Sequence, residues 1–368
     1  MAFMIAEPDE DDEGIDGESS EEDDVVPNVS YNVTSYGSDP EVESLVNRLR
    51  RGDVIIPAFQ RDYVWRQPEA SKFIESLLLG LPVPGLFFAV DPDTSQQLVI
   101  DGQQRLKTLQ FFYDGYFNPK PTSKTQKVFS LVKVQKAFEG LTYKTLREND
   151  RIRLDTAIIH ATTVKQASPL GDHTSLYHIF ERLNSGGRRL TDQEMRLAIY
   201  HGKLIDLTKE LNSYATWRRV FGKTHSRLKD QELILRFFAL FDNLSHYHRP
   251  LSEFLNKYAG KHRNPSDALL KSDAELFCRT IDIFADSLEG KPFRLTTSLN
   301  VAVFETCMVG LAKRLKSKKS LPDSARVQKA YKALLGDKDY MEAVSRSTAD
   351  PIFVNRRMKK ATEAFSEC

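Results

Sequence analysis

The first residues that could do chemistry form a polar turn between a strand and a helix. A short apolar strand ends at Asp101, and the sequence continues Gly102-Gln103-Gln104-Arg105. A helix that begins directly after Gly102 directs unpaired N–H groups and the positive end of its dipole outward, which favours an anion. Gly102 would let a phosphate approach the backbone, Arg105 could bind its oxygens through two parallel hydrogen bonds, and Asp101 could hold a metal ion, a ribose hydroxyl or an attacking water. An ordinary strand–turn–helix, with Asp101 as the helix cap, explains the same residues, and both interpretations stay open.

A second polar segment, residues 56–65, follows another short strand and reads Ile-Pro-Ala-Phe-Gln-Arg-Asp-Tyr-Val-Trp. Gln60 and Arg61 place an amide and a guanidinium beside aromatic rings, a combination that could hold a base or a phosphate. The aromatic residues of the segment are better explained as core residues that fix the loop: Phe59, Tyr63 and Trp65.

A third segment, residues 180–191, ends one helix with Asn184-Ser185-Gly186-Gly187 and begins the next at Thr191. The two glycines permit positive φ angles, so the exposed amides of this turn could form a nest for an anion. A plain helix–helix turn with Asn184 as the C-terminal cap accounts for the pattern equally well.

The spacing of apolar residues predicts the elements that must position these segments. Helices are expected before Gly52, from Pro68 to Gly80 and over residues 102–113. Two short strands are expected over 86–90 and 97–101, and a longer one over 152–164. From Leu176 onward the period is helical almost everywhere. We therefore predict an α+β protein in three parts: a disordered acidic tail over 1–37, a small mixed sheet with helices over 38–168, and an all-α domain over 169–368.

The net charge of +1 conceals two regions of opposite character. Residues 1–47 contain no Lys or Arg and fifteen of the 51 acidic residues, so the remaining chain carries 52 basic residues against 36 acidic ones, a surplus of +16. Such a basic body favours polyanionic partners, above all nucleic acid or nucleotides. A solvated surface with a solubilising tail is the alternative. No run of eighteen apolar residues is present, and three widely spaced cysteines fit a reducing cytoplasm, so we expect a cytoplasmic protein without a membrane span.

Four segments taken together resemble a known family. They are Ile-Pro-Ala-Phe-Gln-Arg-Asp-Tyr-Val-Trp (56–65), Leu-Pro-Val-Pro (81–84), Val-Ile-Asp-Gly-Gln-Gln-Arg-Leu (99–106) and Phe-Glu-Arg-Leu-Asn-Ser-Gly-Gly (180–187). In this order they look like the N-terminal domain of GmrSD-type modification-dependent restriction enzymes, over roughly residues 40–200. The resemblance implies a ParB/sulfiredoxin-like core that binds, and in several members hydrolyses, a nucleoside triphosphate, with roles in bacterial defence against phage.

The resemblance also assigns site residues. It implies nucleotide binding by residues of all three segments: Gln60, Arg61, Gly102, Gln103, Arg105 and Asn184. Asp101, Gln104 and Arg105 would be the catalytic residues, and Asp101 would also hold Mg²⁺ beside GTP or ATP.

The chain departs from the family after residue 200. Many relatives carry a second domain with a His-containing nuclease motif, whereas the histidine cluster here, His246 and His248, follows a helix without the strand and acidic residue that a one-metal nuclease needs. We therefore expect the nucleotide- and DNA-sensing half alone, with any nuclease as a partner subunit. The DNA-facing or partner-facing surface would be the basic all-α part: Arg188, Arg189, Arg218, Arg219 and Arg227.

The sequence leaves three functions open. The first is a nucleotide-binding protein of a prokaryotic defence system that interacts with DNA and could hydrolyse NTP. The second is a Mg²⁺-dependent DNA nuclease that uses the cleft between Asp101 and Arg105. The third is a scaffold whose glutamine and arginine side chains only hold the domain together.

Overall fold

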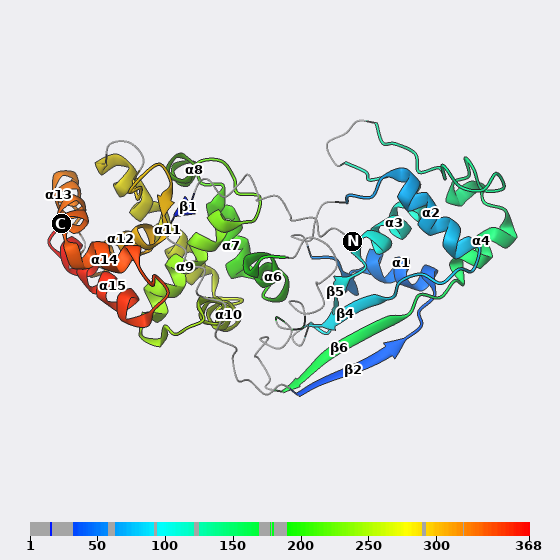
Figure 1. Cartoon of the computed structure of the whole chain (residues 1–368), viewed down its shortest axis with the longest axis horizontal. Coiled ribbons are helices and arrows are strands. Elements are labelled where there is room, and N and C mark those ends of the chain that lie inside the picture. The colour runs from blue at the N-terminus through cyan, green and yellow to red at the C-terminus, as the bar shows by residue number, and fades with distance from the viewer. Residues whose placement is uncertain are drawn as a thin grey trace, which may run out of the picture. The chain divides into compact units, whose positions relative to one another are not determined.

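The structure is a computed structural model of the 368-residue chain. It describes residues 15–16, 32–57, 63–91, 94–120, 125–168, 177, 179, 190–288, 292–318 and 320–368. The chain divides into two compact units (Figure 1). The sheet unit contains Ser30–Leu190 and Leu197–Ile199, and the helical unit contains Met1–Val29, Thr191–Arg196 and Tyr200–Cys368.

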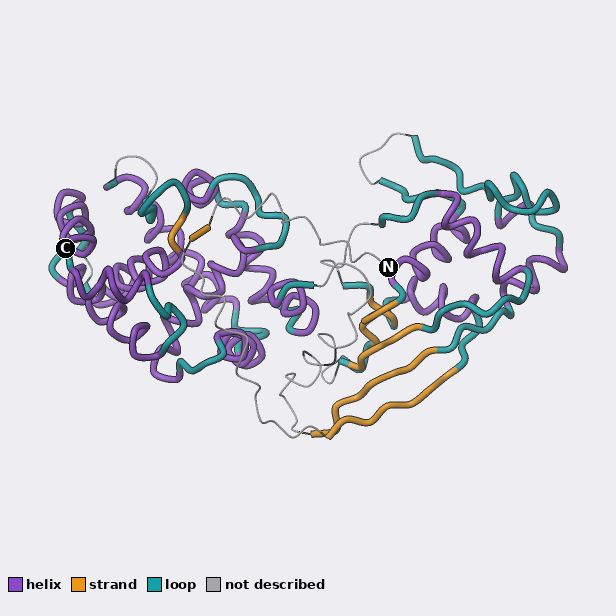
Figure 2. The backbone as a smooth tube through the Cα atoms, in the orientation of Figure 1, coloured by secondary structure: helices purple, strands orange, loops and turns teal. Residues whose placement is uncertain are grey.

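The sheet unit is built on a five-stranded mixed sheet with the order β2-β6-β4-β5-β3. Its strands are β2 (Asn32–Ser38), β3 (Val54–Ile55), β4 (Leu86–Val90), β5 (Gln97–Asp101) and β6 (Ala161–Ser168). Its helices are α1 (Val42–Arg51), α2 (Gln67–Leu78), α3 (Gln103–Asp114), the 3-10 helix η3 (Tyr143–Thr145) and α4 (Glu148–Asp155). In Figure 2 the four α-helices lie on one side of this sheet. Their apolar faces bury a core against buried strand residues such as Leu86, Phe88 and Val99.

Local sequence signals explain most of these elements. Helix α1 buries Val42, Leu45 and Val46, and Gly52 ends it in the left-handed conformation, where a glycine is favoured. Helix α2 begins with a proline in its first turn, and Glu69 accepts the N–H of Arg66 at 2.8 Å. Strands β4 and β5 have the bounds that the sequence predicted.

Two predicted elements are wrong in part. The predicted disordered tail over 1–37 extends too far, because Asn32–Ser38 forms β2 and pairs antiparallel with β6. Residues 34–38 of this edge strand are exposed, and their sequence lacks the apolar alternation that predicts a strand. The hydrogen bonds of this strand come from β6, which is distant in sequence. The predicted strand over 152–164 contains the end of helix α4, in which acidic residues near the start and Arg153 in the last turn complement the helix dipole.

The helical unit consists of a helical bundle and one very short sheet. Its helices are α7 (Lys203–Asn212), α8 (Ala215–Phe221), α9 (Lys229–Asn243), η4 (Leu244–His246), α10 (Leu251–Lys261), α11 (Asp267–Ser287), α12 (Val301–Ser317), α13 (Ser324–Gly336), α14 (Lys338–Ser345) and α15 (Pro351–Ser366). Helix α6 (Asp192–Ile199) is shared between the two units. Strand β1 (Ile15–Asp16) pairs in parallel with β7 (Leu299–Asn300). Helix α12 is buried along most of its length and packs against α9, α11 and α15.

The predicted fold class, a small mixed sheet with helices followed by a helical region, is confirmed. Within the described ranges, no helix combines the length and the apolar character needed to cross a membrane.

Candidate functional site

The turn between β5 and α3 requires a glycine for two reasons. Gly102 has φ +102°, a backbone conformation that other residues rarely adopt. A Cβ atom on this residue would lie 2.2 Å from the Cδ2 atom of Leu86 and 3.4 Å from an Nη atom of Arg105. Packing against Leu86 therefore explains the glycine without a ligand, and the predicted approach of a phosphate to this backbone remains a prediction.

Asp101 and Arg105 face each other across the first turn of α3. An Nη atom of Arg105 donates to Oδ2 of Asp101 at 2.8 Å, and the side chain of Asp101 is 59% exposed whereas that of Arg105 is only 13% exposed. Within the part of the chain that the structure describes, the Nε atom of Arg105 is buried and has no hydrogen-bond partner. The turn therefore holds a largely buried guanidinium with one unused donor, next to an exposed carboxylate.

Gln104 holds the preceding loop in place. Its Oε1 atom accepts the N–H of Val64 at 3.0 Å and the N–H of Trp65 at 3.4 Å. Gln103, the first residue of α3, is half-buried. Because the amide oxygen of Gln104 is used by the backbone, we describe Gln104 as a positioning residue, and its predicted catalytic role is untested.

Of the aromatic residues of the loop, Tyr63 belongs to the core, as expected, and the half-buried Trp65 packs against it. Tyr63 is buried, its hydroxyl lies 2.7 Å from Oγ1 of Thr108, and its ring meets Phe111 edge to face at 5.0 Å. Burial raises the pKa of Tyr63 to about 12. The Trp65 ring packs edge to face against Phe73 at 5.7 Å. Phe59 lies outside the described residues.

The structure brings together only the site residues that adjoin in sequence, Asp101 to Arg105. Gln60, Arg61 and Asn184 lie outside the described residues, so their predicted place beside this turn is untested.

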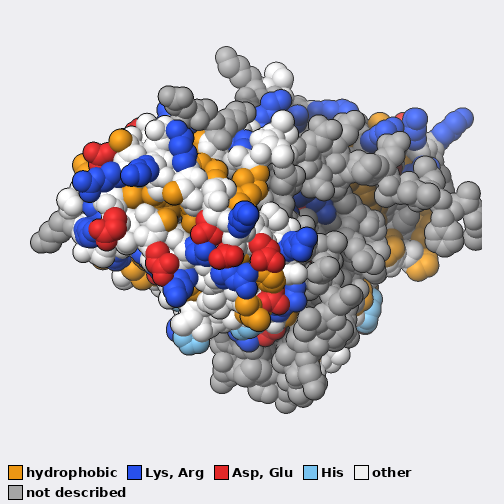
Figure 3. Space-filling view, turned by 60° about the vertical axis from the view of Figure 1, so that its left-hand side comes forward, with side chains coloured by type: hydrophobic (Ala, Val, Ile, Leu, Met, Phe, Trp, Pro, Cys, Tyr) orange, Lys and Arg blue, Asp and Glu red, His pale blue; other side chains and the backbone are white. Residues whose placement is uncertain are grey.

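Of the arginines predicted to form a DNA-facing surface, Arg218 and Arg227 are held in ion pairs within the helical unit. Arg218 donates to the buried Asp230 at 2.8 Å and lies over the Trp217 ring at 5.7 Å, so it stabilises the core. Arg227 lies 3.5 Å from Glu194, and the exposed Arg219 lies 3.6 Å from Asp286. Arg188 and Arg189 lie outside the described residues. Figure 3 shows acidic and basic side chains interspersed on this face of the protein.

The described residues contain no site that could hold a metal ion through three protein side chains. They contain no group of three His, Cys, Asp or Glu side chains that could ligate one. Nδ1 of His246 lies 3.1 Å from Oγ of Ser245, and Nδ1 of His248 lies 3.3 Å from the carbonyl oxygen of Arg249. Asp101 alone could bind Mg²⁺ only as a ligand shared with phosphate oxygens, which is the usual arrangement for this ion.

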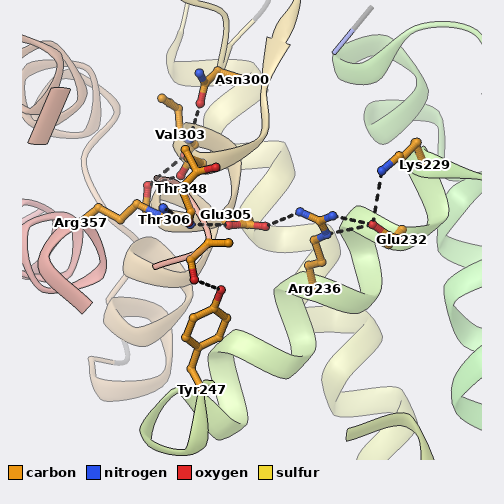
Figure 4. A network of polar contacts seen from close by, with 12 residues as sticks. Lys229, Glu232, Arg236, Tyr247, Asn300, Val303, Glu305, Thr306, Thr348 and Arg357 are labelled. Carbon is orange, nitrogen blue, oxygen red and sulfur yellow. Dashed lines mark hydrogen bonds and ion pairs between the residues drawn. The ribbon is translucent and has the colours of Figure 1, made fainter. Parts of the chain in front are cut away.

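Sequence reasoning missed a chain of buried charges through the helical unit (Figure 4). It runs over four helices and consists of Arg196, Glu232, Arg236, Glu305 and Arg357. Arg236 donates to Glu232 at 2.6 Å and to Glu305 at 3.2 Å, and Arg357 donates to Glu305 at 3.1 Å. Burial alone would raise the pKa of Glu232, but Arg236, Lys229 and Arg196 lower it to about 2. The sequence signals were Glu305 and Arg236, each the one charged residue in a largely apolar run, Val301–Ala312 and Leu233–Phe241.

Comparison with known proteins finds a family match for the part of the chain that contains the turn from Asp101 to Arg105. No curated protein matches the chain. Residues 42–201 match the family model described as GmrSD restriction endonuclease, N-terminal domain. The match includes the turn from Asp101 to Arg105 and all four of the segments that suggested the resemblance. The resemblance to the N-terminal domain of GmrSD restriction endonucleases is therefore confirmed for residues 42–201.

Proposed function

We propose that the protein acts in a prokaryotic restriction-type defence system, where it binds a nucleoside triphosphate and interacts with DNA. The family match supports the restriction-type role. The nucleotide would bind at the turn between β5 and α3, with its phosphates against Arg105. DNA would bind to the basic body of the chain, and a partner subunit would supply nuclease activity.

The observation that carries the nucleotide proposal is the environment of Arg105. Its guanidinium is largely buried at the start of a twelve-residue helix and keeps one donor unused among the described residues. The helix dipole adds positive potential at the same end, and charge-assisted bonds from arginine to phosphate are among the strongest in proteins. Asp101 holds the guanidinium in a fixed orientation before any ligand arrives.

Each residue of the turn has a defined part in this proposal. Arg105 would bind phosphate oxygens, and Gln104 would keep the loop after β3 in position through Val64 and Trp65. Gln60 and Arg61 of that loop, together with Asn184, would complete the nucleotide contacts. Mg²⁺ bound with GTP or ATP would neutralise phosphate charge, and Asp101 is the carboxylate that could share it. Hydrolysis, if the protein performs it, would use Asp101 to orient a water.

The test is calorimetric titration of the full chain with ATP and GTP, each with Mg²⁺. We expect binding of at least one nucleotide by the wild type and a loss of at least about tenfold in affinity for Arg105→Lys, because lysine lacks the Nε donor and the planar fork. Arg50→Ala is the matched control, since it removes an exposed arginine of the same unit that pairs with Asp114. Absence of binding by the wild type would refute the nucleotide proposal.

Two further measurements separate the rival functions. If the glutamine and arginine side chains only hold the domain together, Arg105→Lys lowers the melting temperature and the wild type binds no nucleotide. If the turn is a nuclease site, the wild type cleaves plasmid DNA with Mg²⁺ or Mn²⁺ and without NTP, and Asp101→Asn abolishes the cleavage. The nuclease hypothesis rests on the exposed carboxylate of Asp101, which lies beside Arg105.

A further inference from the structure

The segment after helix α3 carries an unbalanced positive charge. Residues 115–138 contain five lysines and no aspartate or glutamate. The two stretches 115–120 and 125–129 lie side by side, and we call them the basic arm. Lys120 and Lys127 of this arm are exposed, and within the described residues neither forms an ion pair with an acid. The arm therefore presents positive charge that the described part of the chain does not neutralise.

Backbone and side-chain hydrogen bonds hold the basic arm together. The N–H of Phe117 donates to the carbonyl oxygen of Lys127 at 2.8 Å. The side chain of Gln126 bonds to the backbone of Lys120 in both directions, since its Oε1 atom accepts the N–H at 3.0 Å and its Nε2 atom donates to the carbonyl oxygen at 2.7 Å. The side-chain amide thus replaces a pair of backbone hydrogen bonds of an antiparallel ladder. Both lysines therefore extend from an ordered backbone.

One face of the basic arm packs on the core, and the other is exposed. The ring of Phe117 meets the rings of Phe129 at 5.1 Å and Tyr63 at 5.7 Å, both edge to face. Tyr116 and Val128 pair across the arm and are 46% and 55% exposed. Because successive residues of an extended chain point to opposite faces, the packing of Phe117 turns Tyr116 outward. An aromatic and an aliphatic side chain are therefore fixed together at the surface.

This combination of side chains fits DNA. Lysines without an internal partner bind backbone phosphates and release the counterions around them. The major groove is about 12 Å wide and admits a two-stranded β-ribbon, and apolar side chains contact thymine methyl groups there. Exposed lysines of the helical unit differ, because Lys203 pairs with Asp267 and Lys257 with Glu253, each at 2.7 Å. Unpaired charge beside an exposed apolar pair therefore distinguishes the basic arm from those two lysines.

We propose that the basic arm is a DNA-binding element, in which Lys120 and Lys127 bind backbone phosphates of duplex DNA and the pair of Tyr116 and Val128 contacts the groove between them. The inference rests on the DNA interaction proposed above and assigns a surface to it. That surface lies in the sheet unit, whereas the sequence suggested the all-α part. The packing of Phe117 orders the arm before DNA binds, so little conformational entropy is lost on binding.

Two further lysines of the same segment provide a matched control. Lys133 and Lys136 are also exposed. Acidic side chains lie close to them, because Glu139 accepts the N–H of Lys133 at 3.3 Å and Glu75 accepts the N–H of Gln135 at 2.7 Å. These carboxylates offset the positive charge nearby. Replacement of both lysines by glutamine therefore removes the same formal charge as the corresponding change in the basic arm, but from a position that DNA should not contact.

The test measures binding of labelled duplex DNA by the full chain at several salt concentrations, with fluorescence anisotropy as the readout. Lys120→Gln combined with Lys127→Gln should weaken binding at low salt by at least about fivefold and reduce the slope of log affinity against log salt by about two, because two phosphate contacts are lost. Lys133→Gln combined with Lys136→Gln should change the affinity by less than about twofold. Tyr116→Ala should lower the affinity by at least about threefold with an unchanged slope, since it removes no charge. All melting temperatures should stay within about 2 °C of the wild type, because the substituted side chains are exposed.

Three outcomes would overturn the proposal. If the wild type binds DNA and the arm variant with both lysines replaced binds it as well as the control variant does, the arm is not the DNA surface and the proposed function stands. If the wild type binds no DNA, the DNA part of the proposed function is wrong together with the role of the arm. If the arm variant keeps its DNA affinity but no longer sediments with vesicles of equal parts phosphatidylcholine and phosphatidylserine, the arm binds anionic membranes instead.

Discussion

The side-chain oxygen of Gln104 accepts the backbone N–H of Val64 at 3.0 Å, across 40 positions of sequence. The first turn of α3 and the loop that enters α2 are thus fixed to each other. This link matters for the proposed site because Arg105, the next residue, presents its guanidinium from the same turn. Gln104 positions the loop, whereas Arg105 would contact the ligand. A substitution of Gln104 should therefore lower stability, and a substitution of Arg105 should lower nucleotide affinity.

Gln104→Leu should lower the free energy of unfolding by about 1–2 kcal/mol, because it leaves the N–H groups of Val64 and Trp65 without their acceptor. Urea unfolding measures the change. Gln110→Leu, on the same helix, is the control and should alter stability by less than about 0.5 kcal/mol. An equal loss in both variants would show that the loop does not depend on Gln104.

Gly102→Ala should be more destabilising than Gly115→Ala. Both glycines have positive φ, but a Cβ atom on Gly115 meets nothing within 4 Å, whereas one on Gly102 meets Leu86 at 2.2 Å. We expect about 1–2 kcal/mol from the backbone alone at Gly115 and about 1–3 kcal/mol more at Gly102 from overpacking. The difference between the free energies of unfolding of the two variants gives the contribution of packing against Leu86. Similar losses of stability in both variants would contradict the tight contact with Leu86.

Alkaline pH should destabilise the sheet unit through Tyr63. Burial raises the pKa of this phenol from 10.0 to about 12 in the folded state. Between these values the unfolded chain loses the proton while the folded chain keeps it, so the stability that the phenol contributes is complete below pH 10 and declines as the pH rises toward 12. Tyr63→Phe should have a shallower decline over that range, as measured by urea unfolding. A slope unchanged by the substitution would assign the decline to other groups.

Glu305→Gln should lower stability by about 3–5 kcal/mol, because it breaks a buried network, leaves Arg357 without a carboxylate partner and leaves Arg236 with Glu232 alone. The control is Glu342→Gln, whose partner Arg356 is half-exposed, and the expected loss there is less than about 1 kcal/mol. Denaturant unfolding of the two variants in parallel provides the measurement. A small loss for Glu305→Gln would mean that the helical unit tolerates an unpaired arginine.

The acidic residues near the N-terminus should compete with DNA for the basic body of the chain. Replacement of Glu21, Glu22, Asp23 and Asp24 by their amides removes four of the twelve acids before residue 25 and leaves strand β2 intact. The variant should bind DNA more tightly than the wild type at low salt and about equally at high salt, because salt screens the competition. Fluorescence anisotropy with labelled duplex DNA measures this, and identical low-salt affinities would leave the acids as solubilising groups.

Local signals made part of the fold predictable. The caps and apolar faces of α1 and α2, and the apolar strands β4 and β5, each follow from fewer than fifteen consecutive residues. The turn from Asp101 to Arg105 was predictable for the same reason, since its residues adjoin in sequence.

Long-range pairing accounts for what the sequence did not reveal. The exposed strand β2 is a strand only because β6 lies beside it, and Ile152 belongs to a helix although β-branched residues favour strands. The buried charges of the helical unit were missed because Glu305 meets Arg236 and Arg357 across separations of 69 and 52 positions. Two of these charges do have a visible signal in the sequence, because Glu305 and Arg236 are each the one charged residue in a largely apolar run, 301–312 and 233–241.

The pairing of β2 with β6 also determines when the sheet can form during synthesis of the chain. Ser38 lies opposite Ala161 and Asn32 opposite Ser168, so the first strand of the sheet has no partner until the last one has left the ribosome. Until then β2 is an unpaired strand, and β6 will cover it only after helices α1 to α4 have been made. We therefore expect the sheet to close only when β6 has been made, with strand β2 accessible to proteases and chaperones until then.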